Sequence, residues 1–142
     1  MKVNIEKTIH MNRNKIFDII SNHHNFKILL PRVFLSIKIM SFRAKTYVAE
    51  EHINIFNDEK IITSKYVINR PFSREISILG GDGKGSHITE KYTEICEGTK
   101  LNMNIDLKFN KLKIINYLLK NKFIKETSNI VNCFVYELEK RD

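Results

Sequence analysis

The sequence predicts an α+β protein in which a curved antiparallel sheet of seven strands wraps around one long C-terminal helix. Residues 33–109 consist of short segments in which apolar and polar residues alternate, as in strands with one buried face. The last third of the chain instead repeats apolar residues at steps of four, or of seven counted as two turns, which is helical spacing. A single helix after such a sheet is expected to cover the sheet's apolar face. The apolar residues of this helix are Ile115, Leu119, Phe123, Ile130, Phe134 and Leu138.

The N-terminal part of the chain predicts one strand and two short helices. Residues 3–9 alternate between apolar and polar and are expected to form the first strand. Asn12 can cap a helix over residues 13–21, because its side chain can accept hydrogen bonds from free backbone N–H groups of the first turn. A second helical segment over residues 23–30 ends at Pro31, since proline cannot continue a helix.

Six further strands follow, and each is rich in β-branched or aromatic residues. Turn residues separate them at 57–59 and 97–99. Consecutive hairpins imply antiparallel pairing, and the natural twist of strands bends such a sheet. The predicted strands are 33–42, 46–56, 60–69, 72–79, 86–96 and 100–109.

Length and composition indicate a single globular domain over residues 1–142. No apolar run approaches the roughly 18 residues that suggest a membrane span, and the N-terminus lacks the apolar segment of a secretory signal. Cys96 and Cys133 form neither a disulfide framework nor a zinc motif. We therefore expect a cytoplasmic protein without a cofactor.

The chain is basic, with 24 Lys and Arg against 16 Asp and Glu. Such a charge can attract nucleic acid or an anionic membrane. No basic strand is interleaved with aromatic residues that could stack on bases, so we expect no specific nucleic-acid binding. The front half of the long helix is basic and amphipathic, which fits either a solvated face or contact with anionic lipid. Its lysines are Lys111, Lys113, Lys120, Lys122 and Lys125.

Side-chain alternation places charged residues on the inner face of the sheet. Glu51, Arg74 and Glu90 share the parity of their apolar neighbours, together with Tyr66 and Tyr92. Because an unpaired buried charge is costly, such residues are usually paired or border a wet cavity. The pattern predicts a Glu–Arg–Glu cluster that anchors a ligand, although a bulge could send one of these side chains to the rim.

The same periodicity makes weaker predictions for three other residues. Strand parity places Phe72 and Cys96 on the inner face, and helical spacing places Cys133 on the apolar side of the last helix. Neither cysteine has a neighbouring base that would mark it as a nucleophile.

Two other motifs fail as functional sites. In the glycine-rich loop 80–85, Lys84 is followed by glycine and not by Ser or Thr, so the loop is no phosphate-binding loop, and we expect a hairpin connection that could act as a gate. His23 and His24 would point about 100° apart on a helix and could not hold one metal ion together, so we expect no metal site.

The order of elements resembles the helix-grip superfamily, which includes START-like proteins, polyketide cyclases, coenzyme-Q-binding proteins and relatives of the birch-pollen allergen. The resemblance depends on the Leu29-Leu30-Pro31 stop before the second strand, on Glu97-Gly98-Thr99 before the last strand, and on the terminal helix. The plant allergens carry their glycine-rich loop early in the sheet. Here it joins the fifth and sixth strands, so their ligand rules are not transferred.

The resemblance implies a small hydrophobic ligand, such as a lipid, an isoprenoid quinone or a polyketide-like molecule, between sheet and helix. Arg74 could meet its carbonyl or carboxylate. The alternative is a cyclase or dehydratase in which Glu90 or Glu51 is the general base and Tyr66 or Tyr92 is the proton donor. The expected ligand-binding residues are Glu51, Tyr66, Arg74, Glu90, Tyr92, Met103, Ile105, Leu119 and Phe123.

Overall fold

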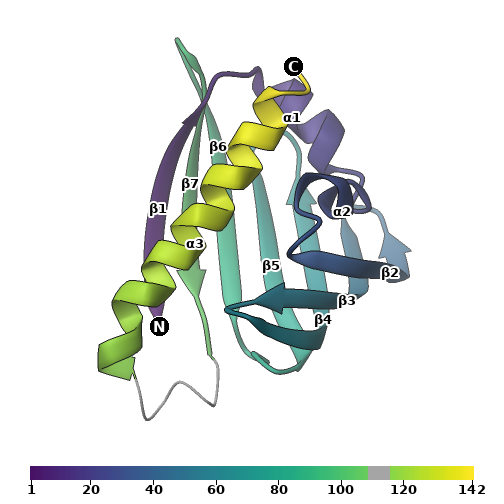
Figure 1. The fold of residues 1–142 in the computed structure, drawn as a ribbon. Coiled ribbons are helices and arrows are strands. Elements are labelled where there is room, and N and C mark those ends of the chain that lie inside the picture. The colour runs from purple at the N-terminus through teal and green to yellow at the C-terminus, as the bar shows by residue number, and fades with distance from the viewer. Residues whose placement is uncertain (109–115) are drawn as a thin grey trace.

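A computed structural model describes residues 1–108 and 116–142 of the chain, with side chains for all of these except 116–119. One curved antiparallel sheet has the strand order β1-β7-β6-β5-β4-β3-β2, and helix α3 crosses its concave face (Figure 1). The predicted α+β architecture is confirmed. The strands are β1 (Lys2–Ile9), β2 (Phe34–Arg43), β3 (Thr46–Ile55), β4 (Asp58–Asn69), β5 (Ser73–Gly81), β6 (His87–Ile95) and β7 (Gly98–Asp106), and the helices are α1 (Arg13–Ile20), α2 (Asn25–Leu29) and α3 (Asn116–Glu139).

The two short helices lie between β1 and β2. Asn12 caps α1 as predicted, since its side chain accepts a hydrogen bond of 2.8 Å from the backbone N–H of Asn14. Helix α2 is shorter than the predicted segment 23–30, because the preceding residues form a turn in which the backbone N–H of Phe26 donates to the carbonyl of His23. His23 therefore lies in a turn between the helices.

Two hairpins show why their turn residues are needed. Phe56 and Asn57 both have positive φ angles, 55° and 57°, as a two-residue hairpin turn of type I′ requires. Strand β4 consequently begins at Asp58, two residues earlier than predicted. Gly98 has φ of 139°, and a Cβ atom at this position would lie 2.4 Å from the carbonyl oxygen of Ile9. Only glycine lets the end of β1 approach this closely.

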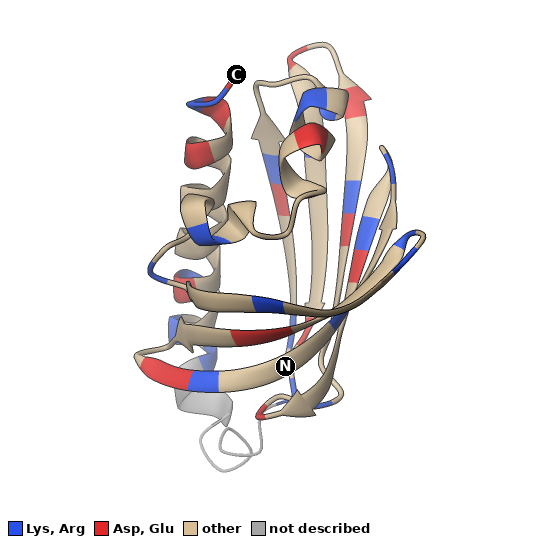
Figure 2. Ribbon diagram, turned by 90° about the vertical axis from the view of Figure 1, so that its right-hand side faces the viewer, with Lys and Arg blue, Asp and Glu red and all other residues tan. Residues whose placement is uncertain are grey.

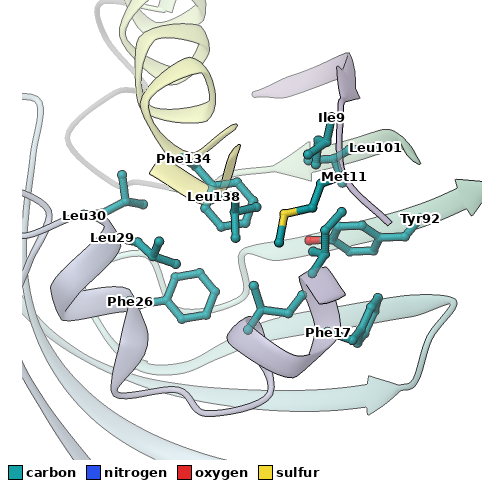
Figure 3. Close-up of a cluster of buried hydrophobic side chains, with 12 residues drawn as sticks. Ile9, Met11, Phe17, Phe26, Leu29, Leu30, Tyr92, Leu101, Phe134 and Leu138 are labelled. Carbon is teal, nitrogen blue, oxygen red and sulfur yellow. The ribbon is translucent and has the colours of Figure 1, made fainter. Parts of the chain in front are cut away.

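A cluster of apolar side chains fills one end of the space between the sheet and the helices. Phe17 and Tyr92 meet edge to face at 4.9 Å, and Phe26 stacks on Phe134 of α3 at 5.9 Å (Figure 3). Leu138, near the end of α3, is completely buried in this cluster. The C-terminal half of α3 is therefore held against α2 and the sheet.

The apolar stripe of α3 is confirmed where its side chains are described. Phe123, Phe134 and Leu138 are buried, and Ile130 is half-buried. Ile115 and the side chain of Leu119 lie outside the described residues.

Three residues that the sequence pattern placed on a buried face are exposed, so these predictions are wrong. Cys133 is exposed, because it directly precedes the stripe residue Phe134 and points about 100° away from it. Phe72 is 53% exposed and Cys96 is exposed. Both residues lie just beyond a strand, before β5 and after β6, where alternation no longer decides which way a side chain points.

Charged residues are distributed over the strands with both signs interspersed (Figure 2). Lys120, Lys122 and Lys125 are exposed on α3, whereas Lys111 and Lys113 lie outside the described residues. No helix within the described ranges is both long enough and apolar enough to cross a membrane. Contact of α3 with anionic lipid stays a prediction.

Candidate functional site

A cavity of about 200 Å³ lies between the sheet and α3. Inward-facing side chains of the strands form one wall, with Ile62 from β4, Ile76 from β5 and Ile105 from β7. Thr127 and Val131 of α3 contribute the opposite wall. The lining is mostly apolar, with a few buried polar groups, which is typical of sites for small organic ligands.

Arg74 and Glu90 form a buried ion pair beside this cavity. They are direct cross-strand partners on β5 and β6, which explains why alternation placed both on the inner face. The guanidinium donates two hydrogen bonds to the carboxylate, Nε to Oε1 at 3.0 Å and Nη2 to Oε2 at 2.8 Å. The hydroxyl of Tyr92 also donates to Glu90 Oε1, at 2.7 Å. Burial disfavours the positive charge, but the carboxylate of Glu90 outweighs burial and raises the pKa of Arg74.

Glu51 belongs to a second buried network, which includes His23. Its Oε2 atom lies 2.7 Å from His23 Nε2 and accepts a hydrogen bond of 2.7 Å from the hydroxyl of Tyr66. The hydroxyl of Tyr47 lies 2.9 Å from His23 Nδ1. This geometry is satisfied by a neutral imidazole that donates through Nε2–H to Glu51 and accepts at Nδ1 from Tyr47.

The electrostatics of this network agree with that proton arrangement. Burial lowers the pKa of His23 and outweighs the opposite effect of Glu51, so the imidazole is neutral at neutral pH. Burial also raises the pKa of Tyr47 to about 12 and that of Tyr66 well above its usual value. Both hydroxyls therefore keep their protons and act as hydrogen-bond donors.

The structure shows two buried pairs in place of the single Glu–Arg–Glu cluster that alternation predicted. On β4, the cross-strand partner of Glu51 is Ile62 and that of Arg74 is Ile68. Along β4, Tyr66 lies between Ile62 and Ile68. Glu51 and Arg74 therefore lie on opposite sides of Tyr66. Glu51 therefore pairs with His23, and Arg74 pairs with Glu90.

The structure brings five of the nine predicted ligand-binding residues to the cavity wall. Glu90 and Tyr92 are absent from the lining. Glu90 instead supports Arg74 from behind the cavity wall, and Tyr92 packs in the apolar cluster. Phe123 is also absent, but its ring lies 5.1 Å from that of Phe56, which lines the cavity. The side chain of Leu119 lies outside the described residues. The five that line it are Glu51, Tyr66, Arg74, Met103 and Ile105.

His23 is a member of the site that its sequence pattern did not reveal. Its pairing with His24 suggested only a test for a metal site, and the local sequence carries no signal for a contact with β3. In the part of the chain that the structure describes, no three His, Cys, Asp or Glu side chains gather to hold a metal ion.

The glycine-rich loop between β5 and β6 lies at the edge of the cavity. Asp82 and Gly83 contribute to the lining. Lys60 of β4 bridges Asp82 and Asp58, so this loop is tied to the start of β4. The loop is a hairpin connection, as predicted.

Comparison with solved structures identifies the fold. TTHA0849 from Thermus thermophilus superposes with a TM-score of 0.82 at 15% identity, covering 99% of this chain and 96% of that chain. The Zhui aromatase/cyclase from a Streptomyces species gives a TM-score of 0.79 at 10% identity, covering 99% and 94%. Ara h 8.0201 gives 0.68 at 13% identity, covering 97% of each chain.

At the sequence level, no family model and no curated protein matches the chain. The structural similarity extends over nearly its whole length, from β1 to the end of α3. The chain therefore has the helix-grip fold that its element order indicated.

Proposed function

We propose that this protein binds a small hydrophobic molecule in the cavity between the sheet and α3. The observation that carries the proposal is the apolar cavity of about 200 Å³ with two buried polar networks in its wall. Its volume lies below the roughly 300–1,000 Å³ of sites that enclose drug-sized ligands. The cavity suits a compact molecule, or one end of a longer one such as an isoprenoid or a polyketide-like chain.

The Zhui protein, which has a similar fold, is named an aromatase/cyclase, and this similarity supports binding of an organic molecule. In this chain α3 supplies Ile130 and Val131 to the cavity, and the sheet supplies mostly isoleucine. Burial of a ligand's apolar surface against these side chains would supply most of the binding free energy.

The experiment combines ligand extraction with a variant that fills the cavity. Organic extracts of the purified protein are analysed by mass spectrometry, and binding of the neutral dye Nile red is titrated by fluorescence. Ile78→Phe places a ring in the cavity and is expected to weaken dye binding at least about tenfold, or 1.4 kcal/mol.

Ile39→Phe is the matched control. Ile39 is half-buried like Ile78 and packs against the same group of Tyr47, Ala49, Tyr66 and Ile76, but it does not line the cavity. Dye binding by this variant should resemble that of the wild type. An extract without any organic molecule, together with no dye binding by the wild type, would contradict the proposal.

One observation favours a second candidate, an enzyme of the cyclase or dehydratase kind. Glu51 and Tyr66 are hydrogen-bonded at 2.7 Å and both line the cavity, so a carboxylate and a hydroxyl face the same interior. Glu51 would serve as the general base. Tyr66 would then have to donate a proton. Its raised pKa argues against that role, because it makes the hydroxyl a weak acid at neutral pH. If the protein is an enzyme, Glu51→Gln should abolish turnover of a poly-β-ketone while affinity is retained.

A further inference from the structure

Buried polar atoms in the cavity wall lack hydrogen-bond partners. Among the described residues, neither Glu51 Oε1 nor Arg74 Nη1 has a partner in good hydrogen-bonding geometry, although their residues are only 1% and 4% exposed. The hydroxyl of Tyr47 interacts with the guanidinium of Arg74, but outside that geometry. Ser64 Oγ, also in the lining, is unpaired as well. Buried polar groups are rarely left in this state, because each has lost its hydration without compensation.

The two charged residues need opposite kinds of partner. Glu51 Oε1 is an acceptor and requires an O–H or N–H group. Arg74 Nη1 carries N–H groups and requires an oxygen such as that of a carbonyl. Tyr66 lies between them, with its hydroxyl on Glu51 Oε2 and its ring centroid 5.5 Å from Arg74 Cζ. Both residues line the same cavity, so a single small molecule bound there would lie beside both side chains.

The balance of charge in this wall decides between neutral and anionic ligands. The positive charge of Arg74 is already matched by Glu90 through two hydrogen bonds. The groups around Glu51 are His23, Tyr47 and Tyr66, which are neutral at neutral pH as described above. Among the described residues of this wall, the carboxylate of Glu51 is thus the charge without a counter-charge of its own. Asp82, the other charged residue of the lining in the described part of the chain, is paired with Lys60 at the edge of the cavity.

We infer that the cavity selects a neutral hydroxy-carbonyl compound, whose hydroxyl donates to Glu51 and whose carbonyl accepts from Arg74, and that it rejects carboxylates. This inference rests on the proposed binding function and specifies its ligand class. A carboxylate would meet the charge of Glu51, which is almost completely buried, and would find the guanidinium already paired with Glu90. An ammonium group would suit Glu51 but would lose its hydration and leave Arg74 Nη1 unpaired.

The test uses three probes with the same ten-carbon chain: 4-hydroxydecan-2-one, decan-2-one and decanoate. Affinities are measured at neutral pH by displacement of Nile red and by amide chemical shifts in NMR titrations. The hydroxyketone should bind at least about tenfold more tightly than the ketone, because it makes an additional hydrogen bond to a charged group. Decanoate should bind most weakly.

Two variants test the origin of this order. Glu51→Gln keeps the shape of the side chain and removes its charge, so the preference for the hydroxyketone should shrink severalfold and binding of decanoate should increase. Glu75→Gln is the matched control, because Glu75 is the exposed neighbour of Arg74 on β5. It should leave the order of the three probes unchanged. If Glu51→Gln does not fold, as judged by far-UV circular dichroism, the order of the three affinities for the wild type still tests the proposed ligand class.

The outcomes separate this inference from the proposed function. If decanoate or decan-2-one binds as tightly as the hydroxyketone, the ligand class is wrong while binding of a hydrophobic molecule stands. An unchanged probe order in a folded Glu51→Gln variant contradicts the role of Glu51. If no probe and no dye binds, the proposed function fails and the ligand class fails with it.

Discussion

Removing the negative charge of Glu90 tests the electrostatic core of the site. In Glu90→Gln the side chain keeps its shape, but Arg74, which is 4% exposed, loses its counter-charge. Breaking a buried ion pair by removing one partner costs about 3–5 kcal/mol. The new amide oxygen still accepts a hydrogen bond from the guanidinium or from Tyr92, so we expect the lower end, about 3 kcal/mol. In a chain of this size, that corresponds to a decrease in Tm of roughly 6–12 °C.

The assay is urea unfolding followed by far-UV circular dichroism, with an unchanged m value as evidence that only stability differs. The matched control is Glu75→Gln, which removes the same charge from the exposed face of β5 and should stay within about 0.5 kcal/mol of the wild type. The double variant Arg74→Met/Glu90→Gln also removes the guanidinium that Glu90→Gln leaves without a counter-charge, and it should be more stable than Glu90→Gln alone. A loss below about 1 kcal/mol in Glu90→Gln, or a double variant no more stable than the single one, would refute the reasoning.

Three further predictions concern stability. Leu138→Ala should cost about 2–5 kcal/mol in urea unfolding, since the Leu138 side chain of α3 is completely buried in the apolar cluster; a loss below about 1 kcal/mol would place this helix off the sheet. Gly98→Ala should cost about 1–3 kcal/mol from its backbone conformation alone, and wild-type stability would contradict the close approach of Ile9. Because the pKa of His23 is lowered in the folded state, the unfolded chain takes up the proton first as pH falls below about 6.5. The free energy of unfolding should therefore decrease as the pH is lowered from about 7.5 to about 5.5, and this decrease should be smaller in His23→Gln. The same decrease in both proteins would refute the lowered pKa of His23.

The elements and their order could be predicted from the sequence because alternation and helical spacing are local properties of the chain. The same alternation correctly placed Glu51, Tyr66, Arg74 and Glu90 on the inner face of the sheet. It failed for Phe72 and Cys96, which lie outside the strands where the pleat fixes side-chain direction.

The pairing of these inner residues was decided by the tertiary structure. Cross-strand register placed Glu90 opposite Arg74 and moved Glu51 to the other side of Tyr66. A turn distant in sequence then brought His23 to within 2.7 Å of Glu51. No local pattern encodes such a contact, because it depends on the twist of the sheet and on where the short helices pack against it. The sequence alone therefore determines which residues within the strands face the interior, whereas the three-dimensional packing determines which of them meet, which loop residues join them and where a cavity remains.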